Sequence, residues 1–326
     1  MTSASLPHTV RVIALTLDTA LDTVLDRSVL LGYAKPGLAL RRRLPSWPED
    51  PPRLDGKVVV LTGATTGIGR AAASALVDLG ADVHVLGRDA RRTTAAADDV
   101  GAVPHVCDVS SLVSLRAFLD HWSGPVDVII NNAGSFLPER RLSADGVELT
   151  FATNVLGPFV LVQGLQDALR PGGRVLTVSS GGMYGQRLDR SHLDNDDYSP
   201  AKAYARTKRA EVVLTQMWAE RLAPRQVVCH SLHPGWADTP GVASSLPRFR
   251  RLMGPLLRTP QEGADTLVWL AGAPEAGAST GLFWHDRRPR PTYWAGLNRE
   301  SRADREALWE HCTELAGQAQ GRTPPM

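Results

Sequence analysis

The sequence predicts an α/β protein: a doubly wound parallel sheet of seven strands in a single domain, with a helical extension at the N-terminus and a helix at the C-terminus. Two observations carry this prediction. From Lys57 onward, short runs rich in β-branched residues alternate with Ala/Leu-rich segments, as in right-handed βαβ units whose sheet is covered on both faces. The first run ends in the glycine-rich turn "TGATTGIGR", Thr62 to Arg70, at a position where such sheets bind ligands.

The composition is that of a globular protein with ample material for a core: 43% of the 326 residues are hydrophobic and 21% are charged. The net charge of +2 gives no field that would attract nucleic acid. Cys107, Cys229 and Cys312 form no CxxC pair, and the spacing of His230 and His233 does not suit metal ligation, so neither a disulfide framework nor a metal site is expected. No apolar run approaches the ~20 residues of a bilayer span, and no signal peptide is recognised. We therefore expect a cytoplasmic protein, in contact with a membrane at its periphery at most.

The N-terminal extension, residues 1–55, is predicted to hold an amphipathic helix and a Pro-rich connector, "RRRLPSWPEDPPR". Its apolar positions recur at helical spacing: Leu17, Leu21, Val24, Ser28 and Leu31. Asp18, Asp22 and Asp26 fall on another face. Two roles stay open, packing against the body of the protein or docking on a partner or membrane surface, although the acidic stripe would repel anionic lipid.

The central domain is predicted to span residues 56–285. Its seven strands are expected in "KVVVLT", "DVHVLG", "VPHVCD", "VDVIINN", "RVLTVSS", "QVVCHSLH" and "GLFWH". Its helices are expected near residues 70–79, 112–122, 151–169, 204–222 and 261–270. The tail, residues 286–326, is predicted to contain one further helix in "RESRADREALWEHCTELAG".

The glycine-rich turn is suited to a dinucleotide. Gly63 lets the chain turn sharply out of the strand, Gly67 leaves room for a pyrophosphate, and Gly69 lets the helix pack closely on the sheet with its N-terminus facing the anion. Taken alone, the same glycines would also fit a simple tight turn.

Four further motifs occur in order after this turn: "NNAG" at 131–134, "VSS" at 178–180, Tyr204-x-x-x-Lys208 and "HPG" at 233–235. Together with TGxxxGIG they resemble the short-chain dehydrogenase/reductase (SDR) family over residues 56–285, which implies a Rossmann fold. The stretches "VSSGGMYGQRL", "YARTKRAEVVLT", "HPGWADTPGV" and "GLFWHDRRP" are similar to the group of dehydrogenase/reductase SDR family member twelve and the retinol dehydrogenase-like enzymes, over nearly the whole chain.

The cofactor is expected to be NADP(H) rather than NAD(H). The second strand ends in Arg88, whose guanidinium can pair with a 2′-phosphate, whereas an acid there would accept from a ribose hydroxyl. Because hydrogen bonds to charged groups contribute roughly 1.5–3 kcal/mol, a preference of about tenfold or more follows. Asp89 is the competing signal, with Arg88 as a solvated charge. Arg70 is expected to add a second positive group near the same phosphate.

The resemblance implies further contacts to the cofactor. They are Thr65, Thr66, Ile68, Asp108, Val109, Asn132, Pro234, Gly235 and Thr239, together with Tyr204 and Lys208. Asp108 matches the family's adenine contact, but it can equally cap the following helix. Thr239 matches the residue that bonds the nicotinamide carboxamide, with a turn threonine as the alternative.

The chemistry implied is hydride transfer between the cofactor and a carbonyl or alcohol, with the protein supplying a proton. Tyr204 and Lys208 lie one helical turn apart, so the ammonium group can favour the phenolate and make Tyr204 a better acid–base group. By the resemblance, Ser180 stabilises the substrate oxygen and Asn154 positions a water that links Lys208 to solvent. Tyr198 is a weaker rival to Tyr204, because Pro200 separates it from Lys202.

The segment after "PGWADTP" is expected to arch over the active site. It mixes Phe249, Leu252 and Met253 with Arg248, Arg250, Arg251 and Arg258, and Arg287, Arg288 and Arg290 are expected to line the same side. This composition favours a small apolar carbonyl or alcohol substrate. The arginines suggest an anionic substrate group or membrane surface, or simply a solvated face. The helices around Leu161 and Val213 resemble the family's dimer interface, with a membrane-associated monomer as the alternative.

The leading hypothesis is thus an NADP(H)-dependent oxidoreductase. A dinucleotide-binding sensor or scaffold without turnover is the alternative from another class. A sugar-nucleotide epimerase is disfavoured because only about 40 residues follow the last predicted strand, too few for a separate substrate domain.

Overall fold

The computed structural model describes residues 8–190, 198–245, 247–293 and 299–318. These residues form one sheet in the order β3-β2-β1-β4-β5-β6-β7-β8. Its strands are β1 (Val58–Thr62), β2 (Asp82–Gly87), β3 (Val103–Val106), β4 (Val126–Asn131), β5 (Leu169–Val178), β6 (Val228–Leu232), β7 (Phe283–His285) and β8 (Arg288–Arg290). The predicted doubly wound parallel sheet is confirmed. An antiparallel eighth strand, β8, extends it beyond the seven predicted, because the tight turn after β7 folds the chain back along the sheet edge.

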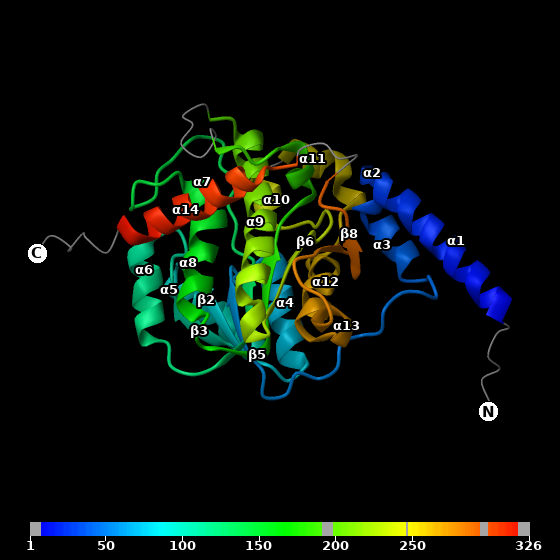
Figure 1. Cartoon of the computed structure of the whole chain (residues 1–326), viewed down its shortest axis with the longest axis horizontal. Coiled ribbons are helices and arrows are strands. Elements are labelled where there is room, and N and C mark those ends of the chain that lie inside the picture. The colour runs from blue at the N-terminus through cyan, green and yellow to red at the C-terminus, as the bar shows by residue number, and fades with distance from the viewer. Residues whose placement is uncertain (1–7, 191–197, 246, 294–298, 319–326) are drawn as a thin grey trace, which may run out of the picture.

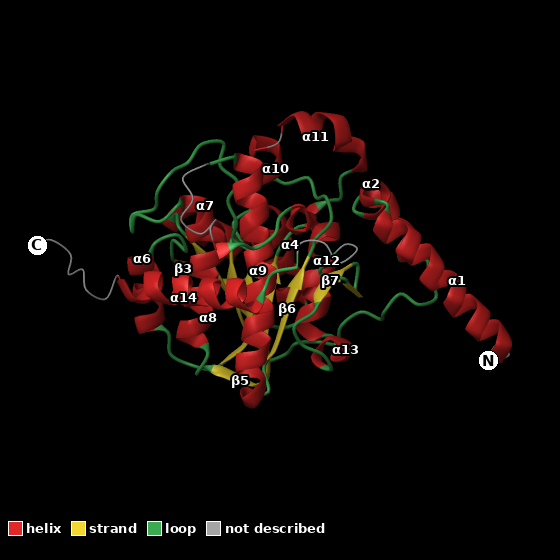
Figure 2. Ribbon diagram, turned by 45° about the horizontal axis from the view of Figure 1, so that its top comes forward, coloured by secondary structure: helices red, strands yellow, loops and turns green. Residues whose placement is uncertain are grey.

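Helices cover both faces of the sheet (Figures 1 and 2). On one face lie α4 (Gly67–Asp78), α5 (Ala90–Val100), α12 (Pro260–Gly272) and α13 (Pro274–Gly277). On the other lie α6 (Leu112–His121), α8 (Gly157–Leu165) and α9 (Pro200–Leu222). The short helix α7 (Leu149–Phe151) and a π-helical turn, η1 (Ala152–Leu156), lead directly into α8. Each layer encloses its own apolar cluster against the sheet, which explains why the strands β1 and β4 are buried almost throughout.

The predicted C-terminal helix is α14 (Arg302–Gln318), and residues 319–326 of the tail lie outside the described ranges. Trp309 of α14 packs on Trp218 of α9 and on Phe159 of α8, with ring centroids 4.7 and 4.9 Å apart. The helix therefore covers part of the surface where a dimer contact was expected, and Leu161 and Val213 are themselves buried in the core. Dimerisation stays a prediction.

The strand order reverses between β1 and β4, since β2 and β3 lie on one side of β1 and all later strands on the other. In parallel sheets the crevice for ligands lies beyond the carboxyl ends of the strands at this reversal. The loops after β1, β4, β5 and β6 converge there. They carry or adjoin the glycine turn and the motifs "NNAG", "VSS" and "HPG", whereas Tyr204 and Lys208 lie on α9.

The N-terminal extension forms α1 (His8–Arg27), α2 (Val29–Gly32) and α3 (Lys35–Arg41), and α1 projects from the body of the molecule (Figure 1). The predicted helix is present, and the structure shows which of its faces meets the rest of the protein. Asp18 and Asp22 are buried, at 7% and 6% exposure, whereas Leu21, Val24 and Leu31 are 37%, 65% and 49% exposed. The acidic stripe, rather than the apolar one, faces the protein.

A buried network of charges explains this orientation. Asp22 pairs with Arg41 and Arg290, both at 2.7 Å, and Asp286 pairs with Arg41 at 2.7 Å and with Arg258 at 2.6 Å. The Gly32 carbonyl accepts from both Arg41 and Arg258. The acidic side chains of α1 therefore turn inward, because buried arginines on other elements need counter-charges.

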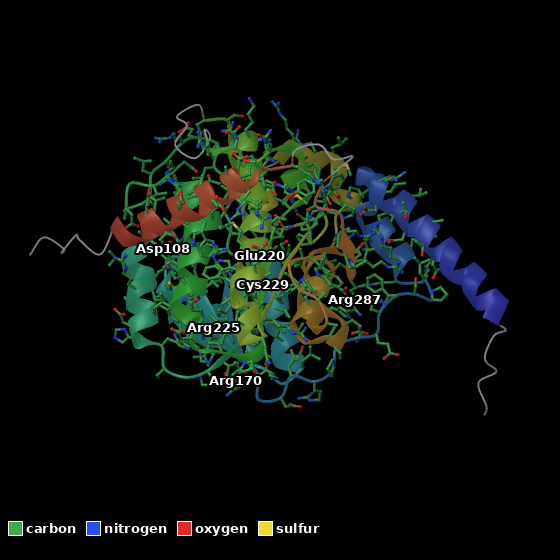
Figure 3. The ribbon with its side chains drawn as sticks, in the orientation of Figure 1. Asp108, Arg170, Glu220, Arg225, Cys229 and Arg287 are labelled. Carbon is green, nitrogen blue, oxygen red and sulfur yellow. The ribbon has the colours of Figure 1, made fainter. Side chains whose placement is uncertain are left out.

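We expected the arginines after β7 to line the side of the substrate. They instead contact the N-terminal extension and α12. Arg287, labelled in Figure 3, pairs with Asp50 of the connector and Asp265 of α12, at 2.7 and 2.9 Å. Arg288 lies 3.6 Å from Asp22, which Arg290 also contacts. These side chains attach the N-terminal extension to the sheet edge. No helix within the described ranges combines the length and the apolar content needed to cross a bilayer.

Candidate active site

The turn between β1 and α4 is held against the loop that follows β4. Gly63 has a φ of +72°, and a Cβ on it would lie 2.7 Å from the Cα of Ala133. The Asn132 carboxamide donates to the carbonyl oxygens of Thr62 and Gly63, each at 3.0 Å. A Cβ on Gly69 would lie 2.3 Å from the Gly63 oxygen. The first and third glycines are therefore required by close backbone packing as well as by any ligand.

Gly67 faces the loop that follows β6. Its φ is +58°, and a Cβ there would lie 3.2 Å from Cγ2 of Thr239. The turn and the predicted nicotinamide contact Thr239 are thus neighbours. The Thr239 hydroxyl also accepts from the Val242 N–H at 3.2 Å, so the turn role considered for it is present. Thr66 precedes α4 without a side-chain capping bond, which leaves the first N–H groups of this helix available to an anion.

The two competing side chains after β2 have separate roles. Asp89 caps α5 by accepting from the Arg92 N–H at 2.8 Å. Arg88 is exposed, and within the described residues it takes part in no ion pair. Arg70 does not stand free as a second phosphate-binding group, because it pairs with Asp99 of α5. Arg88 is therefore the cation available at this strand end.

Asp108, labelled in Figure 3, does not cap the next helix. Its Oδ1 accepts from the Ser110 N–H and hydroxyl at 2.9 and 2.7 Å, while Ser111 caps α6. The next residue, Val109, packs its carbonyl oxygen against Gly157, where a Cβ would approach to 2.2 Å. The adenine contact expected of Asp108 stays a prediction.

Asn154 lies in the π-helical turn η1, a local distortion that is frequent at functional sites. It is fully buried. Its Oδ1 accepts from the Ser135 N–H at 2.7 Å, and its Nδ2 donates to the Ser135 carbonyl at 3.1 Å and to the Thr207 hydroxyl at 2.9 Å. The side chain thus links the loop after β4 to α9.

Tyr204 and Lys208 lie on the face of α9 that is directed at these loops. The Lys208 Nζ is 5.5 Å from the centroid of the Tyr204 ring and 3.6 Å from the position of a Cβ on Gly134. It donates to the Val178 carbonyl at 3.0 Å and to Glu211 Oε1 at 2.8 Å. Burial acts to lower the pKa of Lys208, but the charges of Glu211 and Tyr204 outweigh it and raise the pKa above its ordinary value. The lysine is therefore held as an ammonium ion next to the tyrosine.

The two serines at the end of β5 differ in their contacts. The buried Ser179 donates its hydroxyl to the Lys208 carbonyl at 2.7 Å. The Ser180 hydroxyl is half-buried and accepts from the Gly182 N–H at 3.2 Å, which leaves its proton free to be donated. This difference supports the choice of Ser180. The rival Tyr198 precedes α9 and donates its hydroxyl to the Leu137 carbonyl at 2.9 Å.

Two residues near the site were missed by the sequence analysis. Tyr33 packs edge-on against His233, with ring centroids 4.4 Å apart, and its carbonyl accepts from the Trp236 N–H at 2.8 Å. No local signal in the sequence marks it, since its neighbours lie some 200 positions away. Glu211 contacts Lys208 directly. Its spacing of i, i+3 from the lysine was a visible signal for an ion pair.

Comparisons with known proteins agree with this arrangement. The family model described as short chain dehydrogenase matches residues 57–248. Dehydrogenase/reductase SDR family member 12 of Bos taurus is 38% identical over 279 residues, which cover 81% of this chain and 87% of that protein. Retinol dehydrogenase 12 of Homo sapiens is 31% identical over 280 residues, covering 81% of this chain and 88% of that protein.

A solved structure is similar as well. The crystal structure of a short chain dehydrogenase from Burkholderia cenocepacia in complex with NADP has a TM-score of 0.59 and 26% identity, covering 71% of this chain and 96% of that one. The glycine turn, the loops that meet at the strand reversal and these matches lead to one conclusion: the chain belongs to the short-chain dehydrogenase/reductase family of oxidoreductases.

Proposed function

We propose that the protein is an NADP(H)-dependent oxidoreductase that interconverts an apolar ketone or aldehyde and its alcohol, with Tyr204 as the acid–base group. The observation that carries this proposal is the Lys208 ammonium next to the Tyr204 ring, beside the loop after β4 that packs against the glycine turn. A buried cation beside a phenol lowers the free energy needed to form the phenolate, because the opposite charges attract.

The residues around the crevice fit a nicotinamide dinucleotide. The N-terminus of α4 suits the pyrophosphate, Arg88 suits a 2′-phosphate, and Thr239 lies against Gly67 of the turn. Asn132 fixes the turn to the loop after β4 by donating to the carbonyl oxygens of Thr62 and Gly63. The bound cofactor would supply or accept the hydride.

The protein's own groups would manage the proton and the developing charge. Tyr204 donates its phenolic proton to the carbonyl oxygen in reduction, and Ser180 donates a hydrogen bond to the same oxygen. Lys208 stabilises the phenolate left behind, and Asn154 fixes the loop after β4 against α9. These roles require all four side chains at one place, which a scaffold without turnover would not need.

An apolar substrate is supported by the segment that follows the predicted nicotinamide loop. It forms α10 (Pro240–Ser245) and α11 (Pro247–Met253), which Figure 2 shows at one end of the molecule beside α2. Phe249 packs edge-on against Trp236, and Leu252 is 80% exposed. Two of its arginines are already paired, Arg250 with Asp238 and Arg258 with Asp286, so an anionic substrate is not required to explain them. A retinol dehydrogenase among the relatives points in the same direction.

An assay of NADPH consumption over aldehydes, retinoids, steroids and small diketones tests this function. We expect substrate-dependent oxidation with at least one apolar carbonyl. Tight NADPH binding without oxidation of the cofactor by any of these compounds would instead favour a dinucleotide-binding sensor.

Arg88→Ala is expected to weaken NADPH binding by about tenfold or more and to leave NADH binding nearly unchanged, because only NADPH carries the 2′-phosphate. Arg91→Ala, at an exposed position in the first turn of α5, is the matched control and should change neither affinity beyond about twofold. Fluorescence titration with both cofactors measures the effect. Equal losses for NADPH and NADH in Arg88→Ala would contradict the assignment.

A further inference from the structure

Glu211 is a buried acid that the family motifs do not include, and it touches the lysine of the predicted site. It lies on α9, three residues after Lys208, and its Oε1 accepts from the Lys208 Nζ at 2.8 Å. The two side chains are 3% and 5% exposed. An ion pair removed from water in this way is screened little, so the charge of each member is felt strongly by its neighbours.

Glu211 lines a small cavity. The cavity has a volume of about 20 Å³, and its polar lining comes from Asn131, Asn154, Thr177, Thr215 and Glu211. Within the described residues, neither Glu211 Oε2 nor Asn131 Oδ1 has a hydrogen-bond partner. A space of this size is large enough for one water molecule, and it is lined by the polar groups that such a water needs. A water bound in this cavity would give the Glu211 carboxyl group a partner for proton exchange within the core.

Among the described residues that affect the pKa of Glu211, the only charged one is Lys208, on α9. The neutral groups around Glu211 are Asn131 on β4, Thr177 on β5, Ser179 directly after β5 and Asn154 on η1. Burial raises the pKa of Glu211 to about 7, against the lowering effect of the Lys208 ammonium. The group thus changes its charge in the neutral range, where an ordinary glutamate stays ionised.

We propose that Glu211 is a positioning residue for the reaction, which holds Lys208 in place and controls through it how tightly the Tyr204–Lys208 pair keeps its proton. The proposal rests on the function proposed above for Tyr204 and Lys208. An ionised Glu211 offsets the ammonium charge, so the pair keeps its proton to higher pH. A neutral Glu211 leaves the ammonium uncompensated, and the pair gives up a proton more readily.

The test compares Glu211→Gln with the wild-type protein across pH, by two measurements. The first is NADPH affinity, which should fall once the pair loses its positive charge next to the bound cofactor. The second is kcat/KM for carbonyl reduction, which needs the protonated pair. Plotted against pH, both quantities should decrease on the high-pH side, and this decrease is the descending limb of each profile. In Glu211→Gln we expect both descending limbs to move to lower pH by about 0.5 unit or more, equivalent to roughly threefold in the proton affinity of the pair.

Glu300→Gln is the matched control, because Glu300 forms a buried ion pair with Arg209, the residue next to Lys208, at 2.6 Å. It should leave both limbs in place, and Glu211→Asp should restore the wild-type profile at least in part. Unchanged limbs in Glu211→Gln, or an equal shift in Glu300→Gln, would overturn the proposal. The affinity limb needs no turnover, so a shift there without any reduction supports the role of Glu211 while contradicting the proposed oxidoreductase.

The stability of the protein provides an independent check on the titration of Glu211. A carboxyl group whose pKa is raised in the folded state contributes stability below its unfolded pKa, near 4.5, and loses it as the pH rises through about 7. We therefore expect the melting temperature of the wild type to fall relative to that of Glu211→Gln between these pH values. A constant difference would show that Glu211 does not titrate there and would count against the proposal.

Discussion

Replacing Tyr204 by phenylalanine is expected to abolish turnover while leaving NADPH affinity within a few fold of the wild type. General acid–base groups typically contribute 10²–10⁴-fold to rate, and no other phenol is placed beside Lys208 among the described residues. The ring itself packs on Phe136, with centroids 5.3 Å apart, and phenylalanine preserves this contact. Single-turnover kinetics and fluorescence titration separate the two effects.

Tyr198→Phe serves as the control for this experiment. Its hydroxyl bonds the Leu137 carbonyl, so the change should cost about 1 kcal/mol of stability and leave most of the rate. A Tyr204→Phe protein that keeps more than about a tenth of the wild-type rate would exclude Tyr204 as the acid.

Asp286→Asn is expected to have the largest effect on stability, lowering the free energy of unfolding by about 3–5 kcal/mol. Burial opposes ionisation of Asp286, but the guanidinium groups of Arg258 and Arg41 hold its pKa well below the ordinary value. Both arginines are buried, so the substitution leaves two cations in the core with less counter-charge. Urea denaturation, monitored by circular dichroism, measures the loss.

Asp55→Asn is the exposed counterpart, since its pair with Arg53 lies at the surface, with side chains 65% and 64% exposed. This change should cost little. The network around Asp286 also joins the N-terminal extension to the loop after β6, so limited proteolysis of Asp286→Asn should release the segment before Lys57 faster than in the wild type. A loss below about 1 kcal/mol would show that the buried charges reorganise freely.

Much of the fold and part of the candidate site could be predicted locally. Strand runs such as "KVVVL" are β-branched and apolar, and the helix after Gly69 follows from its Ala/Leu spacing. Tyr204 and Lys208 are one turn apart on any α-helix, so their proximity needs only the correct assignment of α9. Ser180 could be chosen over Ser179 from its motif, and the contacts of the two serines are compatible with that choice.

The partners of the charged side chains could not be predicted in this way. Arg70 was expected near a phosphate and lies instead on Asp99, and the arginines after β7 were expected near substrate and instead bind the N-terminal extension. The sequence left the role of the N-terminal helix open, and the structure buries Asp18 and Asp22 while Leu21, Val24 and Leu31 are exposed.

The sequence by itself determined the strand and helix order, the glycine turn and the Tyr204–Lys208 spacing, because each depends on residues within a few positions of one another. The tertiary structure decided which face of α1 is buried, that Asp286 joins Arg41 to Arg258, and that Glu211 and Lys208 are buried together near Asn154. A charge pairs with whichever opposite charge the folded chain brings within about 4 Å, and that distance depends on elements far apart in the sequence.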